Sequence, residues 1–257
     1  MIQVKNICKS FDGQTVLSNV CTSFEKGKTN LIIGSSGSGK TVLMKCLVGL
    51  VEADSGEIFY GDHDFTKMNF KERRVIRQKL GMLFQGGALF DSLTVAENVM
   101  FPLEMFSSMS KEEKLKRANT CLERVNLHHV NHLYPAELSG GMKKRVAIAR
   151  AISNNPEYLF CDEPNSGLDP TNAIVIDNLI RDITKEFNIT TVINTHDMNS
   201  VMEIGDKVSY IYEGQLWWEG SKEEILYTEN NELNRFVYAT ELLRTLKKPP
   251  KQSNQKQ

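Results

Sequence analysis

Gly34-Ser35-Ser36-Gly37-Ser38-Gly39-Lys40-Thr41 follows the apolar run Leu31-Ile32-Ile33 and precedes apolar residues at helical spacing. This combination predicts a phosphate-binding loop between a strand and a helix. The glycines let successive backbone N–H groups face one concavity, and the N-terminus of the next helix adds partial positive charge, so phosphate is favoured there. We expect Lys40 to reach the β- and γ-phosphates and the Thr41 hydroxyl to hold Mg²⁺. Taken alone, the stretch could also be an ordinary Gly/Ser loop.

The composition is typical of a globular chain. Hydrophobic residues make up 40% and charged residues 25% of 257 residues, enough for one large core or one core with an inserted subdomain. A net charge of −1 argues against nucleic acid as a partner. No apolar run approaches the ~20 residues of a membrane span, and residues 1–5 begin a strand rather than a signal peptide. We therefore expect a cytoplasmic protein with free thiols at its scattered cysteines.

The N-terminal segment predicts an antiparallel sheet ahead of the loop. Ile2, Val4 and Ile7 are spaced as in a strand, Asp12-Gly13 forms a turn, and residues 16–24 are again strand-like. Phe11 precedes the turn and is a candidate to stack on an adenine ring. Its position alone fits a half-buried strand residue at least as well.

Residues 93–154 have helical character and predict a helical insertion in an α/β core. Ser110 and Glu113 form a capping box, and apolar residues follow at spacings of three and four. His128, His129 and His132 could suggest a metal site, but no carboxylate or thiol completes a ligand set nearby. Solvated residues at a helix end are the favoured interpretation.

Leu138-Ser139-Gly140-Gly141-Met142 opens another predicted helix. A serine cap followed by two glycines leaves the first N–H groups of the helix accessible, which is suited to a second anion site. A plain capped helix would have the same sequence features, so the two interpretations stay open on these residues alone.

Two further strands end in candidate catalytic residues. Tyr158-Leu159-Phe160-Cys161 is a continuous apolar run typical of a buried parallel strand, and it places Asp162 and Glu163 where ligands bind in open α/β sheets. Asp162 suits the Mg²⁺ shell, and Glu163 can accept a proton from water. His196 follows the next buried strand, residues 190–194. An acidic turn and a structural histidine are the alternatives.

Six motifs now stand in one order, and together they resemble the ABC-type ATPase cassette. They are Walker A (34–41), the Q-loop (Gln85), the signature (138–142), Walker B (158–163), the D-loop (166–169) and the H-loop (His196). The resemblance covers about residues 1–228. It implies an α/β fold with a P-loop NTPase (RecA-like) core and an N-terminal antiparallel β subdomain in 1–92 and 155–228, and an inserted α-helical subdomain in 93–154. Residues 229–257 would form a C-terminal helix and a basic tail, which is either disordered or wrapped around a partner subunit.

The resemblance also implies a head-to-tail homodimer that holds ATP and Mg²⁺ between Walker A of one subunit and the signature of the other. Its catalytic residues would be Glu163, His196, Gln85 and Lys40, and its metal ligands Thr41, Gln85 and Asp162. The implied nucleotide-binding residues are Phe11, Gly34, Ser35, Ser36, Gly37, Ser38, Gly39, Lys40, Thr41, Val42, Ser139, Gly140, Gly141 and Asp169. Val42 replaces a hydroxyl residue that many cassettes carry.

At a finer level, residues 85–95 and 135–142 resemble the Mla- and Mce-associated phospholipid-transport ATPases. That resemblance implies integral membrane permease subunits, a Mce-type substrate-binding protein as a further candidate partner, and a place on the inner face of the cytoplasmic membrane. The protein would then move phospholipid for outer-membrane lipid asymmetry. An ATPase for another solute, such as an amino acid, and a soluble ATPase of the iron–sulfur assembly type are the alternatives. A DNA-repair head is disfavoured because the roughly 100 residues between Walker A and the signature leave no space for a long coiled coil.

Overall fold

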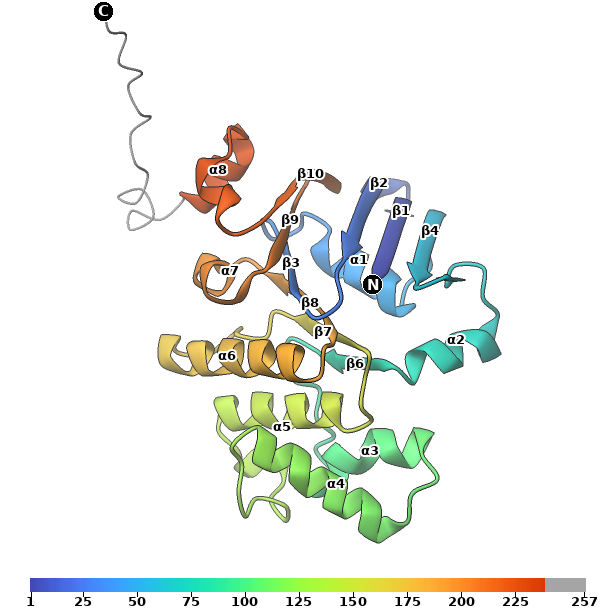
Figure 1. Cartoon of the computed structure of the whole chain (residues 1–257), viewed down its shortest axis with the longest axis vertical. Coiled ribbons are helices and arrows are strands. Elements are labelled where there is room, and N and C mark those ends of the chain that lie inside the picture. The colour runs from blue at the N-terminus through green and yellow to red at the C-terminus, as the bar shows by residue number, and fades with distance from the viewer. Residues whose placement is uncertain (239–257) are drawn as a thin grey trace, which may run out of the picture.

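The structure is a computed structural model, and it describes residues 1–238. Two sheets with helices around them make up this part of the chain (Figure 1). The first sheet is antiparallel and has the strand order β2-β1-β4-β5. Its strands are β1 (Ile2–Phe11), β2 (Gln14–Phe24), β4 (Ser55–Tyr60) and β5 (His63–Asp64). The antiparallel sheet predicted from the N-terminal segment is therefore present.

The second sheet carries the loop, and its order is β10-β9-β3-β8-β7-β6. Neighbouring strands are parallel from β9 to β6, and β10 is antiparallel to β9. The strands are β3 (Thr29–Ile33), β6 (Leu80–Leu83), β7 (Tyr158–Asp162), β8 (Thr190–Thr195), β9 (Lys207–Tyr212) and β10 (Gln215–Gly220). Because β3, β7 and β8 are adjacent and parallel, their carboxyl ends bring Walker A, Asp162 and His196 to one edge.

Side-chain caps define several of the helices. Capping boxes stand at Asn69, Thr94 and Ser110, and Asp169 caps a helix that begins with Pro170. The α-helices are α1 (Lys40–Val48), α2 (Phe70–Arg77), α3 (Val95–Phe106), α4 (Lys111–Arg124), α5 (Gly140–Ile152), α6 (Pro170–Glu186), α7 (Met198–Ile204) and α8 (Asn231–Val237). Two short 3₁₀ helices are η1 (Pro135–Glu137) and η2 (Glu224–Tyr227).

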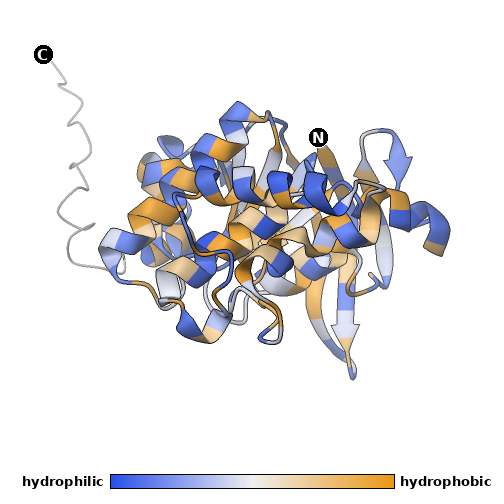
Figure 2. Ribbon diagram, turned by 90° about the horizontal axis from the view of Figure 1, so that it is seen from below, coloured by the Kyte–Doolittle hydropathy of each residue, from blue (hydrophilic) through white to orange (hydrophobic). Residues whose placement is uncertain are grey.

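The parallel sheet separates two hydrophobic clusters. Phe160 of β7 belongs to the cluster shared with α1 and the antiparallel sheet, whereas its neighbour Leu159 belongs to the cluster under the helices. Successive residues of a strand face opposite sides of the sheet, so both faces of β7 must be apolar. Hydrophobic residues are accordingly frequent on the central strands, and hydrophilic residues on the outer helices (Figure 2).

Helices α3, α4 and α5 lie together on one side of the molecule (Figure 1). They fall within the helical insertion expected at 93–154, whose limits stay a prediction. The predicted basic tail lies outside the described residues from position 239 onward. Among residues 1–238, no helix combines the length and apolar character needed to cross a bilayer.

Candidate active site

The phosphate-binding loop links β3 to α1 and is built around three glycines with positive φ. Gly34, Gly37 and Gly39 have φ values of 150°, 79° and 105°. A Cβ on Gly34 would lie 2.2 Å from the Ile211 carbonyl oxygen, so no larger residue fits at that position. The close approach of strand β9 thus requires glycine where the loop begins.

Lys40, the first residue of α1, turns back over this loop. Its Nζ donates hydrogen bonds to the carbonyl oxygens of Gly34 and Ser35, at 2.8 and 2.9 Å. The side chain is only 6% exposed. Burial lowers the pKa of Lys40, and the negative charges of Glu163 and Asp162 partly oppose that shift. A cation held by neutral carbonyls at the floor of a cavity is suited to bind an anion.

Beside Lys40 lie two oxygen-bearing side chains, Thr41 and Asp162, that could coordinate Mg²⁺. The Thr41 hydroxyl donates to Asp162 Oδ1 at 3.3 Å, and the Asn194 side-chain amide donates to the same oxygen at 3.0 Å. Buried Ser38 Oγ has no hydrogen-bond partner among the described residues. No cluster of three or more His, Cys, Asp or Glu side chains suited to a metal occurs in residues 1–238. A hydroxyl and one carboxylate fit Mg²⁺, because this ion is commonly held by few protein ligands together with substrate phosphates.

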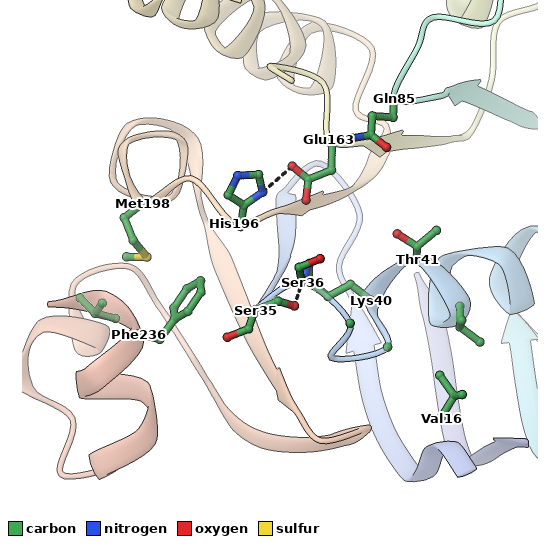
Figure 3. Close-up of a pocket in the computed structure, with 14 residues that line it drawn as sticks. Val16, Ser35, Ser36, Lys40, Thr41, Gln85, Glu163, His196, Met198 and Phe236 are labelled. Atoms are coloured by element: carbon green, nitrogen blue, oxygen red, sulfur yellow. Dashed lines mark hydrogen bonds and ion pairs between the residues drawn. The ribbon is translucent and has the colours of Figure 1, made fainter. Parts of the chain in front are cut away.

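The side chains of Glu163 and His196 point toward each other at the edge of the cavity (Figure 3). His196 Nδ1 is 2.7 Å from Glu163 Oε2, and the Glu163 side chain is mostly buried whereas the imidazole is exposed. Glu163 has φ of 49°, and its N–H donates to the Asn194 carbonyl oxygen at 3.0 Å. A bulky residue in the left-handed region marks a position that the surrounding structure must hold in place.

One cavity of about 640 Å³ joins most of the predicted residues. Those that line it are Ser35, Ser36, Gly37, Gly39, Lys40, Thr41, Val42, Gln85, Glu163 and His196. Gln85 also donates through Nε2 to Ser166 Oγ at 3.3 Å, so the loop after β6 contacts the turn after Walker B.

The remaining predicted residues do not line this cavity. Phe11 is 43% exposed, with Lys9 Nζ 5.2 Å from its ring centroid, and Val16 of β2 lines the cavity instead. The Phe11 ring does not line the cavity, so adenine stacking by this residue stays a prediction. Ser139 and Asp169 serve within the chain as the caps of α5 and α6.

The signature glycines Gly140 and Gly141 lie beside the D-loop and the start of α6, and neither they nor Ser139 line the cavity that contains Lys40. A Cβ on Gly141 would meet Asn172 Oδ1 of α6 at 3.3 Å, and one on Gly140 would meet Leu168 at 3.8 Å. Within a single chain, the second predicted anion site is thus separate from the first.

Sequence reasoning missed two contributors to the site. Lys144 of α5 is buried and donates to the carbonyl oxygens of Gln85 and Glu163, the latter at 3.5 Å. The only local indication of its burial is that Lys144 lies four residues before Ile148, on the apolar face of α5. Phe236 of α8 lines the cavity together with Met198 (Figure 3). No local pattern announced that contact, because α8 is distant in sequence.

The model of the ABC transporter family matches residues 17–166, more than half of the chain. The chain belongs to the ABC transporter family. It is an ATP-hydrolysing transporter subunit that uses ATP with Mg²⁺.

Solved structures agree with the cassette fold. The chain is similar to the dimeric post-hydrolysis state of the ATP-binding cassette MJ0796 bound to ADP and Pi, with a TM-score of 0.79 and 34% identity. That match covers 86% of this chain and 99% of the other. The predicted α/β fold with a P-loop NTPase core is therefore confirmed.

Curated relatives of the cassette correct the finer prediction. The methionine import ATP-binding protein MetN of Campylobacter jejuni is 37% identical over 95% of this chain and 77% of its own length. The protein of the same name from Clostridioides difficile is 38% identical over 92% of this chain and 74% of its own length. These names support the amino-acid alternative, and the predicted membership of the phospholipid branch, with its Mce-type partner, is not supported. Residues 85–95 and 135–142 are too few to separate branches that share the same catalytic motifs.

Proposed function

We propose that this cassette powers the import of methionine or a closely related amino acid through a separate membrane permease. The observation that carries the proposal is the similarity to methionine import ATP-binding proteins over more than nine-tenths of the chain. The substrate would be selected by the permease, while this chain supplies the free energy of ATP hydrolysis.

For the nucleotide, the loop geometry supports a division of labour among the lining residues. The backbone N–H groups of residues 35–39 and the Lys40 ammonium would hold the phosphates, because a helix N-terminus and a buried cation both favour negative charge. Thr41 and Asp162 would hold Mg²⁺, with Gln85 completing its shell from the loop after β6. Mg²⁺ bound there would neutralise charge that develops on the phosphate oxygens.

Glu163 is the best candidate for the general base. Its carboxylate lines the cavity and would accept a proton from the attacking water. The His196 imidazole contacts the same carboxylate at 2.7 Å, so it would limit the rotation of that group and face the terminal phosphate. Both side chains come from the carboxyl ends of adjacent parallel strands, which are rigid supports for a site.

The separation of the signature from Lys40 supports a head-to-tail homodimer. Ser139 and the Gly141 N–H stand at the start of α5 but do not line the cavity of their own chain. A second copy, turned by a two-fold axis, would place its signature over the first copy's phosphates, and the reverse contact would form at the same time. Asp169 would lie at the seam between the two copies.

A groove beside Gln85 supports the permease contact. It has a volume of about 490 Å³ and is lined by apolar side chains that include Met82, Phe84, Phe90, Phe101 and Met105. Four of these are exposed, which is unusual for aromatic and methionine side chains gathered in one place. A cytoplasmic segment of the permease would fit this groove, and the cassette would then be peripheral on the inner face of the membrane.

The test uses Glu163→Gln, which keeps the shape of the side chain and removes the base. We expect the variant to bind ATP, to lose at least about 100-fold in hydrolysis rate, and to accumulate as a dimer with ATP. Affinity purification of this variant with ATP from detergent-solubilised membranes should recover a multispanning permease.

Reconstitution of that permease with the wild-type cassette should give ATP-dependent uptake of radiolabelled methionine into proteoliposomes, and reconstitution with Glu163→Gln should give none. A permease that carries bound phospholipid and takes up no methionine would contradict the substrate. Recovery of soluble partners alone would contradict the role in transport, and normal hydrolysis by Glu163→Gln would remove this residue from the base role.

A further inference from the structure

Asn165 stands two residues after Glu163, in the turn that follows β7, and its side chain points into the molecule. The side-chain Nδ2 donates to Asp177 Oδ1 at 2.8 Å and to Ser200 Oγ at 3.0 Å. Asp177 belongs to α6 and Ser200 to the first turn of α7. One amide thus connects the turn after Walker B to two helices that are distant in sequence.

The three side chains form a polar cluster in which Asp177 and Ser200 are buried and Asn165 is partly buried, and Asn165 Oδ1 has no hydrogen-bond partner among the described residues. Asp177 is 4% exposed and Ser200 is 2% exposed. The Ser200 hydroxyl also bonds with the Asp177 carboxyl, so each member of the cluster contacts the other two. Buried polar groups are costly when unpaired, and a shift of the turn would take the Asn165 donor away from both Asp177 and Ser200, so the two hydrogen bonds resist small shifts of the three segments.

The Asn165–Ser200 hydrogen bond joins the same two segments of the chain as the contact between Glu163 and His196. Glu163 meets His196 through Oε2 and Nδ1, and Asn165 meets Ser200, which lies four residues after His196. The chain from Glu163 to Asn165 and the chain from His196 to Ser200 are therefore tied at both ends. Since Glu163 already has the unfavourable φ of 49°, its orientation depends on such external restraints.

We propose that Asn165 is a positioning residue for ATP hydrolysis, because its amide holds the turn that carries Glu163 against the helix that follows His196. This inference rests on the proposed role of Glu163. It assigns Asn165 no contact with the nucleotide, so its loss should change the rate of the chemical step and leave nucleotide binding intact.

The test compares three side chains at position 165 that donate two, one and no hydrogen bonds. Asn donates two, Asn165→Thr donates one, and Asn165→Val has the shape of Thr but donates none. For the full chain with MgATP we expect kcat to fall on the order of tenfold in Asn165→Val, with Asn165→Thr between the two and KM for ATP within about twofold of wild type. Ser200→Ala, which removes one acceptor, should reproduce part of the loss.

A loss of stability alone would give a different pattern. Ile176→Val is the matched control, since Ile176 is buried on α6 next to Asp177 in sequence and its truncation should lower the temperature of thermal unfolding while leaving the three side chains of the cluster unchanged. Thermal unfolding and ATP binding are measured on every variant. If Ile176→Val loses as much kcat as Asn165→Val, or if Asn165→Val keeps kcat within about twofold of wild type, the positioning role is wrong.

The double variant Glu163→Gln/Asn165→Val separates this inference from the proposed function. If Asn165 acts through Glu163, the double variant hydrolyses ATP as slowly as Glu163→Gln alone. A further loss in the double variant would contradict action through Glu163. Normal turnover by Glu163→Gln would overturn both proposals, whereas an inactive Glu163→Gln with an active Asn165→Val overturns only this one.

Discussion

At the scale of single residues, the site depends on polar groups that burial makes sensitive. Lys40, Lys144 and Asp177 are all buried, and burial favours the neutral form of each: it lowers the pKa of the two lysines and raises the pKa of Asp177. Lys40 and Lys144 donate hydrogen bonds to backbone carbonyl oxygens, which carry no net charge, so the positive charge of each lysine is not neutralised by these partners and can attract an anion in the cavity. The Asp177 carboxyl accepts hydrogen bonds from Asn165 and Ser200, and its ionisation makes the stability of the fold depend on pH.

Asp177→Asn should remove a penalty that grows with pH. Burial raises the pKa of Asp177, and hydrogen bonds from Ser200 and Asn165 oppose that rise only in part, while Asp197 and Glu203 add to it. As pH increases from the unfolded value of 3.8 toward the raised folded value, the unfolded state has released the proton and the folded state still holds it. Stability of the wild type is therefore lost across this window, and the loss is constant at higher pH.

The measurement is urea unfolding of both proteins at a series of pH values between about 4 and 8. The free energy of unfolding of Asp177→Asn relative to wild type should increase with pH and then level off. Asp182→Asn, at a side chain on α6 that is 66% exposed, serves as the control. A difference between Asp177→Asn and wild type that stays flat or decreases with pH would show that the carboxyl carries no such penalty.

At the scale of elements, the start of α1 is the clearest case of backbone geometry serving the site. Gly39 precedes α1 with φ of 105°, and a Cβ there would lie 2.9 Å from Leu17 Cδ2 and 3.0 Å from the Val16 carbonyl oxygen. Gly39→Ala must therefore strain the loop or push β2 away. We expect a loss of about 1–3 kcal/mol in stability and much weaker ATP binding.

Gly13→Ala is the control for Gly39→Ala. Gly13 has φ of 80° in the turn between β1 and β2, and a Cβ there meets no atom within 4 Å. The control should lose some stability, because its φ is unfavourable for alanine, but it should bind ATP as wild type does. Unfolding curves and titration with a fluorescent ATP analogue measure the two effects. Equal ATP affinity in Gly39→Ala and wild type would mean that the loop tolerates the added methyl group.

Elements with local signals could be predicted from the sequence. The capping box at Ser110 and the Asp169-Pro170 start of α6 depend on residues a few positions apart, and the structure has both. The loop glycines, Asp162 and Glu163 could be placed because parallel strands end at one edge of the sheet. The contacts of Lys144 and Phe236 at the site depend on segments far apart in sequence, so the place of Lys144 on the apolar face of α5 could not predict them.

At the scale of the whole molecule, the single chain contains both parts of the proposed site but does not join them. The loop of residues 34–41 lines the cavity, and the signature of residues 138–142 opens α5 beside α6. If each site takes its loop from one copy and its signature from the other, the two parts can be inactivated in different chains. This provides a direct test of the head-to-tail homodimer.

Two inactive variants should therefore restore activity when they are mixed. Lys40→Ala would remove the proposed phosphate contact of the loop, and Ser139→Arg would block the proposed contact of the signature. In a mixed dimer, one site combines both defects, but the other combines an intact loop with an intact signature. With random pairing about half of the dimers are mixed and each has one working site, so about a quarter of wild-type hydrolysis should return, provided that one site turns over independently of the other.

The matched control places both substitutions in one chain and mixes it with wild-type chain. In those mixed dimers every site has one defect, either in the loop or in the signature, so mixing should add nothing beyond the activity of the remaining wild-type dimers. Phosphate release at equal total protein distinguishes the two mixtures, and size-exclusion chromatography with ATP verifies that dimers form. If each chain instead formed a complete site alone, the mixture of Lys40→Ala and Ser139→Arg would stay inactive, because no chain in it would carry both intact parts.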